Sequence, residues 1–288
     1  MKKIAESELI LRKDGSVYHL NLKPADLADN VILVGDPGRV ELISSMFDKV
    51  TKRKQNREIC THTGVYKGKN ISVISTGMGP DNIDIVINEL DALVNVDLEK
   101  RLPKKTHKTL NLVRIGTSGG IQKEIPVGSF LFSSHGIGTD GLLHFYGDSI
   151  KVRCPQIETA MANQIGWPGT WAAPYAVEAN QELLHRLSEG HPTGMTMTFG
   201  GFYGPQGREV RLGLHYKEFN NNVAAFEYQG LKVANFEMET SALYGLAKLL
   251  GHNACTVCVV IANRAAKTFI KDYQPPMKKL IKLILDRI

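Results

Sequence analysis

The sequence lacks long apolar runs, which argues against a membrane or secreted protein. Of its 288 residues, 43% are hydrophobic, but no stretch approaches the roughly 20 consecutive apolar residues that a membrane-spanning helix needs. Residues 1–8 also lack the apolar segment of a signal peptide. We therefore expect a cytoplasmic protein that has no membrane partner.

Cysteine is scarce as well, and four cysteines in a chain of this length do not form a disulfide scaffold. Cys255 and Cys258 have the spacing of a redox motif, but they lie in an apolar run, residues 255–261, that predicts a buried strand. Residues three apart in a strand point to opposite faces, and no neighbouring group would lower the pKa of either thiol. We interpret both as structural thiols.

Clusters of basic or metal-binding residues are also few. The formal net charge is +6, yet the short basic clusters at residues 52–54 and 104–105 are not interleaved with aromatic residues, as a nucleic-acid platform would be. The positive charge instead suits a protein that collects phosphate. We expect no nucleic-acid partner and no metal site, because the candidate histidines lack metal-ligand spacing. These histidines are His62, His107, His135 and His144.

What the sequence does contain is an alternation of short β-rich runs with amphipathic helical patterns, which is typical of an α/β protein. The predicted strands are residues 31–34, 71–75, 109–115, 193–199 and 257–261, and the predicted helices cover residues 83–93, 183–187, 240–250 and 276–288. The length is compatible with one domain over residues 1–288. Residues 147–180 show no period, and we expect an irregular excursion there.

Two motifs that follow predicted strands suggest an anion site. The sequence GDPGR at residues 35–39 leads into a helix expected to begin at about Arg39, where glycines, free N–H groups and a guanidinium favour a phosphate. The sequence RIGTSGG at residues 114–120 places an arginine, two hydroxyls and three glycines at the carboxyl end of a second strand. Open α/β sheets bind their ligands at such ends.

Together with three later motifs, the chain resembles the uridine phosphorylases of the nucleoside phosphorylase family. The later motifs are FYGPQGR at residues 202–208, FEMET at residues 236–240 and IANR at residues 261–264. The resemblance implies a three-layer α/β/α sandwich with a mixed, partly barrel-like central sheet. It also implies active sites shared across a homodimer interface. The segments 97–108 and 147–180 are longer than in hexameric relatives, so a dimer and a hexamer stay equally open.

The same resemblance assigns ligands to three parts of an active site. The implied phosphate ligands are Gly35, Arg39, Arg114, Thr117 and, from the neighbouring subunit, Arg57. The implied ribose ligands are Thr117, Met238, Glu239 and, from the neighbouring subunit, His19. The implied base contacts are Ser118, Gly119, Phe202, Gln206 and Arg208.

The implied reaction is phosphorolysis of uridine, in which inorganic phosphate is the co-substrate and the nucleophile. The catalytic groups expected are Arg114, Gln206, Arg208 and Glu239. Arg114 binds the phosphate, ionised Glu239 accepts the ribose 2′- and 3′-hydroxyls, and preorganised donors stabilise the charge on the departing uracil. No cofactor is expected. A cation near Glu58 stays open, because residues 77–81 depart from the family pattern.

The base that is cleaved depends on residues 262–264. Purine-specific relatives carry an acid there that protonates N7 of the leaving base, whereas this chain has Ala-Asn-Arg. The sequence therefore favours a pyrimidine, and the preference among uridine, 2′-deoxyuridine and thymidine stays open. The alternatives are a purine nucleoside phosphorylase and a non-catalytic nucleoside-binding protein.

Overall fold

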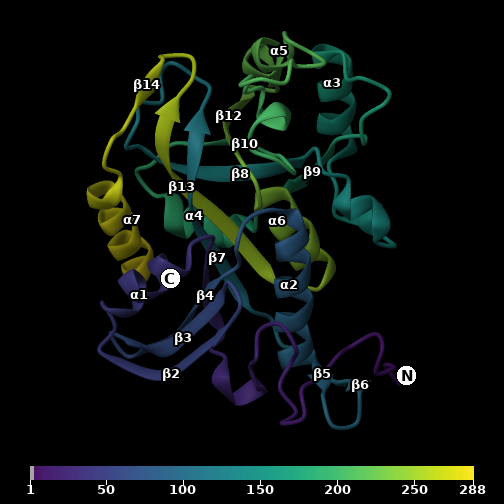
Figure 1. Ribbon diagram of the computed structural model, residues 1–288, viewed down its shortest axis with the longest axis vertical. Coiled ribbons are helices and arrows are strands. Elements are labelled where there is room, and N and C mark those ends of the chain that lie inside the picture. Colours follow the sequence, from purple (N-terminus) through teal and green to yellow (C-terminus); the bar gives the residue numbers. More distant parts are fainter. Residues whose placement is uncertain (1–2) are drawn as a thin grey trace.

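The computed structural model describes residues 3–288, so the first two residues of the N-terminal stretch considered above lie outside it (Figure 1). Across this described range, no helix combines the length and apolar character needed to cross a membrane.

Five strands form a closed, mixed ring at the centre of the fold. They are β7 (Asn111–Gly120), β13 (Asn253–Asn263), β8 (Phe130–Gly138), β10 (Thr193–Thr198) and β12 (Leu231–Glu237). The β13 strand runs parallel to β7 and antiparallel to β8, and β10 is parallel to both of its neighbours. Pairing of β12 with the end of β7 closes the ring. The partly barrel-like sheet predicted from the family resemblance is therefore confirmed.

The sheet continues outward from β7 through β1 (Asn30–Val34), β4 (Lys69–Ser75), β3 (Ile59–Tyr66) and β2 (Lys49–Asn56). The β7, β1 and β4 strands are parallel, and four of the five β1 residues are buried, as expected for a strand covered on both faces. Three short strands add to this sheet: β9 (Tyr175–Glu178), β11 (Glu227–Tyr228) and β14 (Thr268–Phe269). The strands β5 (Val96–Asp97) and β6 (Leu102–Pro103) pair with each other in a separate two-stranded sheet.

Helices cover both faces of this sheet and make the sandwich three-layered (Figure 1). On one side α2 (Pro80–Asn95) packs against α6 (Thr240–Leu249), and on the other lie α1 (Pro37–Ser44), α4 (Gln181–Ser188) and α7 (Gln274–Arg287). The predicted apolar face of α2 is confirmed, because every apolar residue at the expected spacing is fully buried. These residues are Ile83, Val86, Ile87, Leu90 and Leu93.

Residues 147–180 are not the irregular excursion that the sequence predicts. They contain α3 (Pro155–Ile165) and the strand β9, and Trp167 packs edge-on against Phe219 of α5 (Phe219–Ala225). Pro155 does not prevent a helix here, because it occupies the first turn of α3, where its missing N–H costs no hydrogen bond. The remaining short 3₁₀ turns are η1 (Pro24–Asp26), η2 (Leu142–Phe145), η3 (Ser149–Lys151) and η4 (Gly204–Gln206).

The two cysteines of the apparent redox motif are confirmed as buried residues of β13. Both thiols are inaccessible to solvent, and burial raises the pKa of Cys255 and of Cys258 to about 12. A thiol with such a pKa is almost entirely protonated at neutral pH and is a poor nucleophile.

Candidate active site

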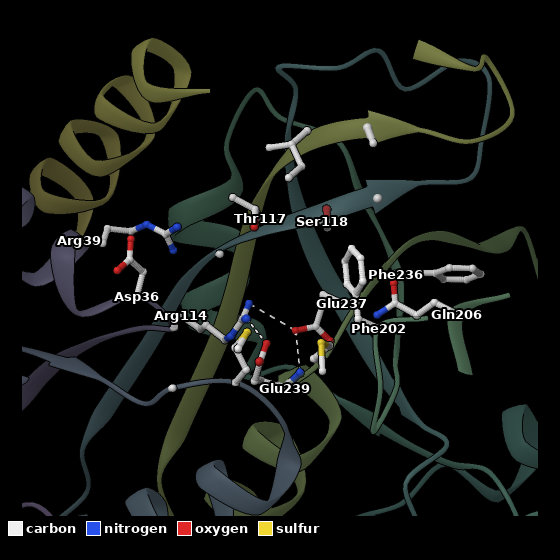
Figure 2. A pocket seen from close by; sticks show the side chains of 18 of the residues that line it. Asp36, Arg39, Arg114, Thr117, Ser118, Phe202, Gln206, Phe236, Glu237 and Glu239 are labelled. Atoms are coloured by element: carbon white, nitrogen blue, oxygen red, sulfur yellow. Dashed lines mark hydrogen bonds and ion pairs between the residues drawn. The ribbon is translucent and has the colours of Figure 1, made fainter. Parts of the chain in front are cut away.

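A cavity of about 700 Å³ opens where β1, β7, β12 and β13 end or pass one another. Figure 2 shows Arg39 at one end of this cavity, Gln206 and Phe202 at the other, and Glu237 and Glu239 between them. All the predicted ligands of this chain's own site line it, namely Gly35, Arg39, Arg114, Thr117, Ser118, Gly119, Phe202, Gln206, Arg208, Met238 and Glu239.

The end of the cavity beside Arg39 is built by the turn between β1 and α1. Asp36 caps α1, since its Oδ1 accepts from the Gly38 N–H at 2.9 Å, and Pro37 begins the helix two residues earlier than predicted. Arg39 is buried, and its Nη1 donates to the Ile115 carbonyl at 3.2 Å. Burial, together with the charge of nearby Arg114, lowers the pKa of Arg39. An anion placed between these two cations would relieve that repulsion.

The second motif, residues 114–120, was predicted to follow a strand. It is instead part of strand β7, which continues through Gly120. A Cβ atom on Gly116 would lie 2.2 Å from Arg114 Nη1 and 3.0 Å from Cys258 Sγ. Glycine is therefore required here so that the Arg114 side chain can lie along its own strand. The Ser118 hydroxyl accepts from Asn235 Nδ2 at 2.8 Å, while Thr117 and Gly119 face the cavity.

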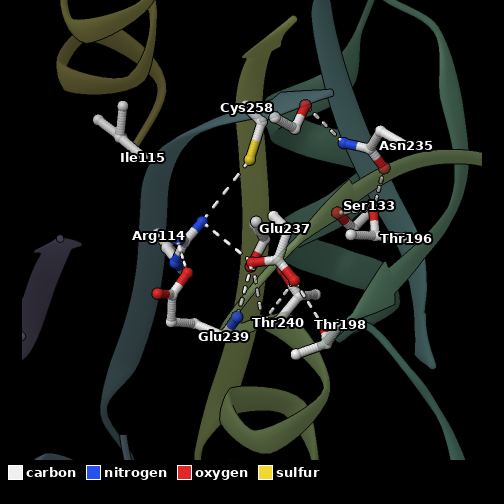
Figure 3. Close-up of polar contacts among 12 residues, drawn as sticks. Arg114, Ile115, Ser133, Thr196, Thr198, Asn235, Glu237, Glu239, Thr240 and Cys258 are labelled. Atoms are coloured by element: carbon white, nitrogen blue, oxygen red, sulfur yellow. Dashed lines mark hydrogen bonds and ion pairs between the residues drawn. The ribbon is translucent and has the colours of Figure 1, made fainter. Parts of the chain in front are cut away.

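Arg114 joins two carboxylates at the end of β12, namely Glu237, the last residue of the strand, and Glu239, two residues later (Figure 3). Its Nη2 pairs with Glu239 Oε2, and its Nη1 lies 3.3 Å from Glu237 Oε2. Burial lowers the pKa of Arg114, but the two carboxylates outweigh burial and hold that pKa above its ordinary value. Burial raises the pKa of Glu239 above its ordinary value, although Arg114 opposes this rise. The Gly79 N–H also donates to Glu239 Oε1 at 2.8 Å, so the geometry stabilises the carboxylate form.

Glu237 is a residue that the motif analysis left without a role. It accepts from the Thr198 hydroxyl at 2.6 Å and from the Glu239 N–H at 2.9 Å, as well as from the first N–H of α6. These bonds fix the β12–α6 turn that carries Met238 and Glu239. The only hint in the sequence was its place two residues before Glu239 in the motif.

A loop at the far end of the cavity holds the Gln206 amide and the Arg208 guanidinium together. The Arg208 guanidinium lies 3.7 Å from the centre of the Phe202 ring, and its Nη1 donates to Gln206 Oε1 at 2.6 Å. Gln206 is only 3% exposed. Arg208 therefore sets the direction of the Gln206 amide and leaves the amide NH₂ to donate to a ligand.

Arg264 supports this loop from behind, a role that its motif did not reveal. Its two terminal nitrogens donate to the Gln206 and Gly207 carbonyls, the second at 2.7 Å. The preceding residue, Asn263, is buried and hydrogen-bonded to the backbone through both ends of its amide. The Nδ2 atom donates to the Gln122 and Ile125 carbonyls, and Oδ1 accepts from the Ala266 N–H.

Two predicted residues, His19 and Arg57, are not among those that line the cavity. The structure nevertheless brings their segments together, since Asn56 Nδ2 donates to the His19 carbonyl at 2.8 Å. Arg57 is exposed at the turn between β2 and β3. Their contribution to a neighbouring subunit's site stays a prediction. Whether a cation binds beside Glu58, which lines the cavity, stays open.

Known proteins with similar sequences or structures are nucleoside phosphorylases. A uridine phosphorylase from Thermococcus kodakarensis is 32% identical over 274 residues, which is 94% of this chain and 86% of that protein. A DeoD-type purine nucleoside phosphorylase from Bacillus cereus is 29% identical over 271 residues, or 93% and 97% of the two chains. A Trypanosoma brucei nucleoside phosphorylase, whose crystal structure is described as showing uridine phosphorylase activity, is 31% identical in sequence. The two structures superpose with a TM-score of 0.89 over 97% of this chain and 98% of that chain.

A more distant structure supports the fold. It comes from a study of two uridine phosphorylases of the oomycete Phytophthora capsici, is 20% identical, has a TM-score of 0.73 and covers 97% of this chain and 98% of its own. The family model described as "Phosphorylase superfamily" matches residues 29–286. This chain belongs to the phosphorylase superfamily.

Proposed function

We propose that this protein is a uridine phosphorylase, a pentosyltransferase that converts uridine and phosphate into uracil and ribose 1-phosphate in pyrimidine nucleoside salvage. The observation that carries the proposal is one cavity with two buried cations, Arg39 and Arg114, at one end and a Gln206–Arg208 pair at the other.

We further propose that residues 1–288 act as one domain, because a single sheet supplies strands to both ends of the cavity.

The phosphate is placed by groups that converge on the β1–α1 turn. Arg39 and Arg114 supply directional N–H donors, which suit a dianion better than point charges do. The Gly35 backbone and the Thr117 hydroxyl lie on the same wall. No protein nucleophile is needed, because a phosphate oxygen attacks C1′ of the sugar while the bond from C1′ to N1 of uracil breaks.

The ribose lies between the two ends, over Met238 and Glu239. The Glu239 carboxylate accepts hydrogen bonds from the 2′- and 3′-hydroxyls of the ribose. It can do so because Arg114 and the Gly79 N–H keep it charged and in place. His19 and Arg57 of a second copy complete the ribose and phosphate ends, so the working unit is a homodimer or a hexamer built from such dimers.

The base end favours a pyrimidine. Gln206 and Arg208 supply an amide and a guanidinium to a ring that leaves with negative charge on its oxygens, and donors aimed at developing charge are usually the largest catalytic contribution. A purine leaving group needs a proton at N7. Residues 262–264, the segment in which purine-specific relatives carry an acid, contain none here, and the Asn263 amide is hydrogen-bonded to three backbone groups.

The test is release of base from uridine and inosine, each with phosphate and with sulfate at the same ionic strength. Sulfate is the matched control because it resembles phosphate in shape and charge. We expect uracil only with phosphate, and little hypoxanthine from inosine. Equal release of uracil with sulfate would identify a hydrolase. Faster cleavage of inosine would favour the purine enzyme, which the similarity to the B. cereus protein makes the relevant alternative.

A further inference from the structure

Glu89 is a buried carboxylate on α2 that lies outside the cavity described above. Its relative exposure is 7%, and it lies on α2 beside Leu90, which is fully buried. Burial of a carboxylate is unfavourable unless hydrogen bonds compensate it. The partners of Glu89 therefore indicate what this residue stabilises.

All of these partners belong to one short segment, which precedes Glu89 by about 70 residues in the sequence. The His19 N–H lies 3.0 Å from both carboxylate oxygens, and the Leu20 N–H donates to Oε2 at 2.8 Å. The His19 ring adds a third contact, with Nδ1 at 2.6 Å from Oε1. Among residues 3–288, no lysine or arginine pairs with Glu89.

These contacts fix both the direction of the His19 ring and the place of its hydrogen. An ionised carboxylate can only accept, so Nδ1 carries a hydrogen and Nε2 is the nitrogen left for another molecule. In the described part of the chain, Nε2 of His19 has no hydrogen-bond partner, and the side chain is 31% exposed. The ring is therefore held at the surface with one defined nitrogen facing outward.

A second contact ties this ring to the arginine predicted to act beside it. Asn56, which directly precedes Arg57, donates from Nδ2 to the His19 carbonyl at 2.8 Å. The two segments that the proposed function assigns to a second copy's site are thus one hydrogen-bonded unit. Glu89 anchors this unit to the interior of its own subunit.

We propose that Glu89 is a positioning residue that sets the tautomer and direction of His19, so that Nε2 binds a ribose hydroxyl in a second copy's site. The inference rests on the proposed function, in which His19 serves the ribose. Glu89 itself touches no substrate and acts only through His19. A carboxylate that merely stabilises the fold would also bind the two N–H groups, so the test must separate the two roles.

The test compares Glu89→Gln with wild type on uridine and on its 2′-, 3′- and 5′-deoxy forms. The glutamine amide presents an NH₂ to Nδ1 and reverses the hydrogen on the ring while keeping the side-chain volume. We expect about a tenfold loss in kcat/KM for uridine, mainly through KM, because Nε2 would then carry the hydrogen and could no longer accept the hydrogen bond that the ribose hydroxyl donates in both ground and transition states. The loss should disappear for the one substrate that lacks the partner hydroxyl.

His19→Ala supplies the matched control. If Glu89 acts through His19, the double variant His19→Ala/Glu89→Gln should be no less active than His19→Ala. An equal loss on all four substrates, or a further loss in the double variant, would show a purely structural role and overturn the proposal.

A readout in the free enzyme separates this inference from the proposed function. In protein labelled with ¹⁵N-histidine, the His19 ring, assigned by its absence in His19→Ala, should show the hydrogen on Nδ1, and Glu89→Gln should move it to Nε2. A hydrogen on Nε2 alone in the wild type would overturn the proposal even if uridine is cleaved. Failure of the wild type to cleave uridine would instead refute the proposed function.

Discussion

Replacement of Arg208 by alanine gives the sharpest test of the base site. The change removes the guanidinium that directs the Gln206 amide and that lies over the Phe202 ring. The loop should keep its course, because Arg264 still holds the Gln206 and Gly207 carbonyls from the other side. Loss of activity would therefore report the missing donor and not a collapsed loop.

The size of the effect follows from when Arg208 acts. A preorganised donor aimed at developing charge contributes about 2.7–4 kcal/mol. Because Arg208 is only partly buried, we take the lower end, about 2.7 kcal/mol, which corresponds to about a 100-fold loss. Most of the loss should appear in kcat, since the charge on uracil develops only in the transition state. The KM for phosphate should hardly change, because Arg39, a proposed phosphate ligand, lies at the other end of the cavity from Gln206 (Figure 2).

The assay is initial-rate uracil formation at varied uridine and varied phosphate. Arg211→Ala is the matched control, because Arg211 is an exposed arginine of the following segment that does not line the cavity. It removes the same formal charge and should change kcat/KM by no more than about twofold. If Arg208→Ala kept activity within threefold of wild type, the assignment of the uracil site would be wrong. A parallel rise in the KM for phosphate would show that the loop had collapsed.

Two further predictions concern the shared site and the strand that carries Arg114. Arg57→Ala and Arg208→Ala should each inactivate the enzyme, but unfolding and refolding them together should restore about a quarter of wild-type activity, since about half the dimers are mixed and each has one intact site. No recovery in mixed dimers confirmed by a mass tag would withdraw the shared-site proposal. Gly116→Ala should raise the KM for phosphate at least tenfold, because its Cβ would displace the Arg114 side chain; an unchanged KM in a steady-state assay would contradict this.

Much of the framework was readable from local patterns. The spacing of apolar residues predicted α2, and a short β-branched run predicted β1, because burial on one face or on both leaves a direct mark on the sequence. The motif around residues 35–39 was read correctly as a strand, a turn and a helix. Glycine, proline and a capping aspartate act on their immediate neighbours there, so no distant contact was needed.

Other features depended on contacts between distant residues. Local patterns did not show that β7 continues through Gly120. Its last residues are extended because they pair with β12 and β13, which are distant in the sequence. Local patterns also gave no structure for residues 147–180, where α3 and β9 are ordered by packing against the rest of the fold.

The active site divides in the same way. The sequence by itself determined which chemical groups are present: two motifs already indicated an anion site, and the resemblance of all five ordered motifs to a known family implied the sugar and base ligands. Only the tertiary structure decided which groups are paired. Arg114 meets Glu239 from 125 residues away, and Arg264 supports Gln206 from 58 residues away. Such pairs depend on the register and closure of the sheet, which no local period encodes, because strand order is set by long-range burial and hydrogen bonding.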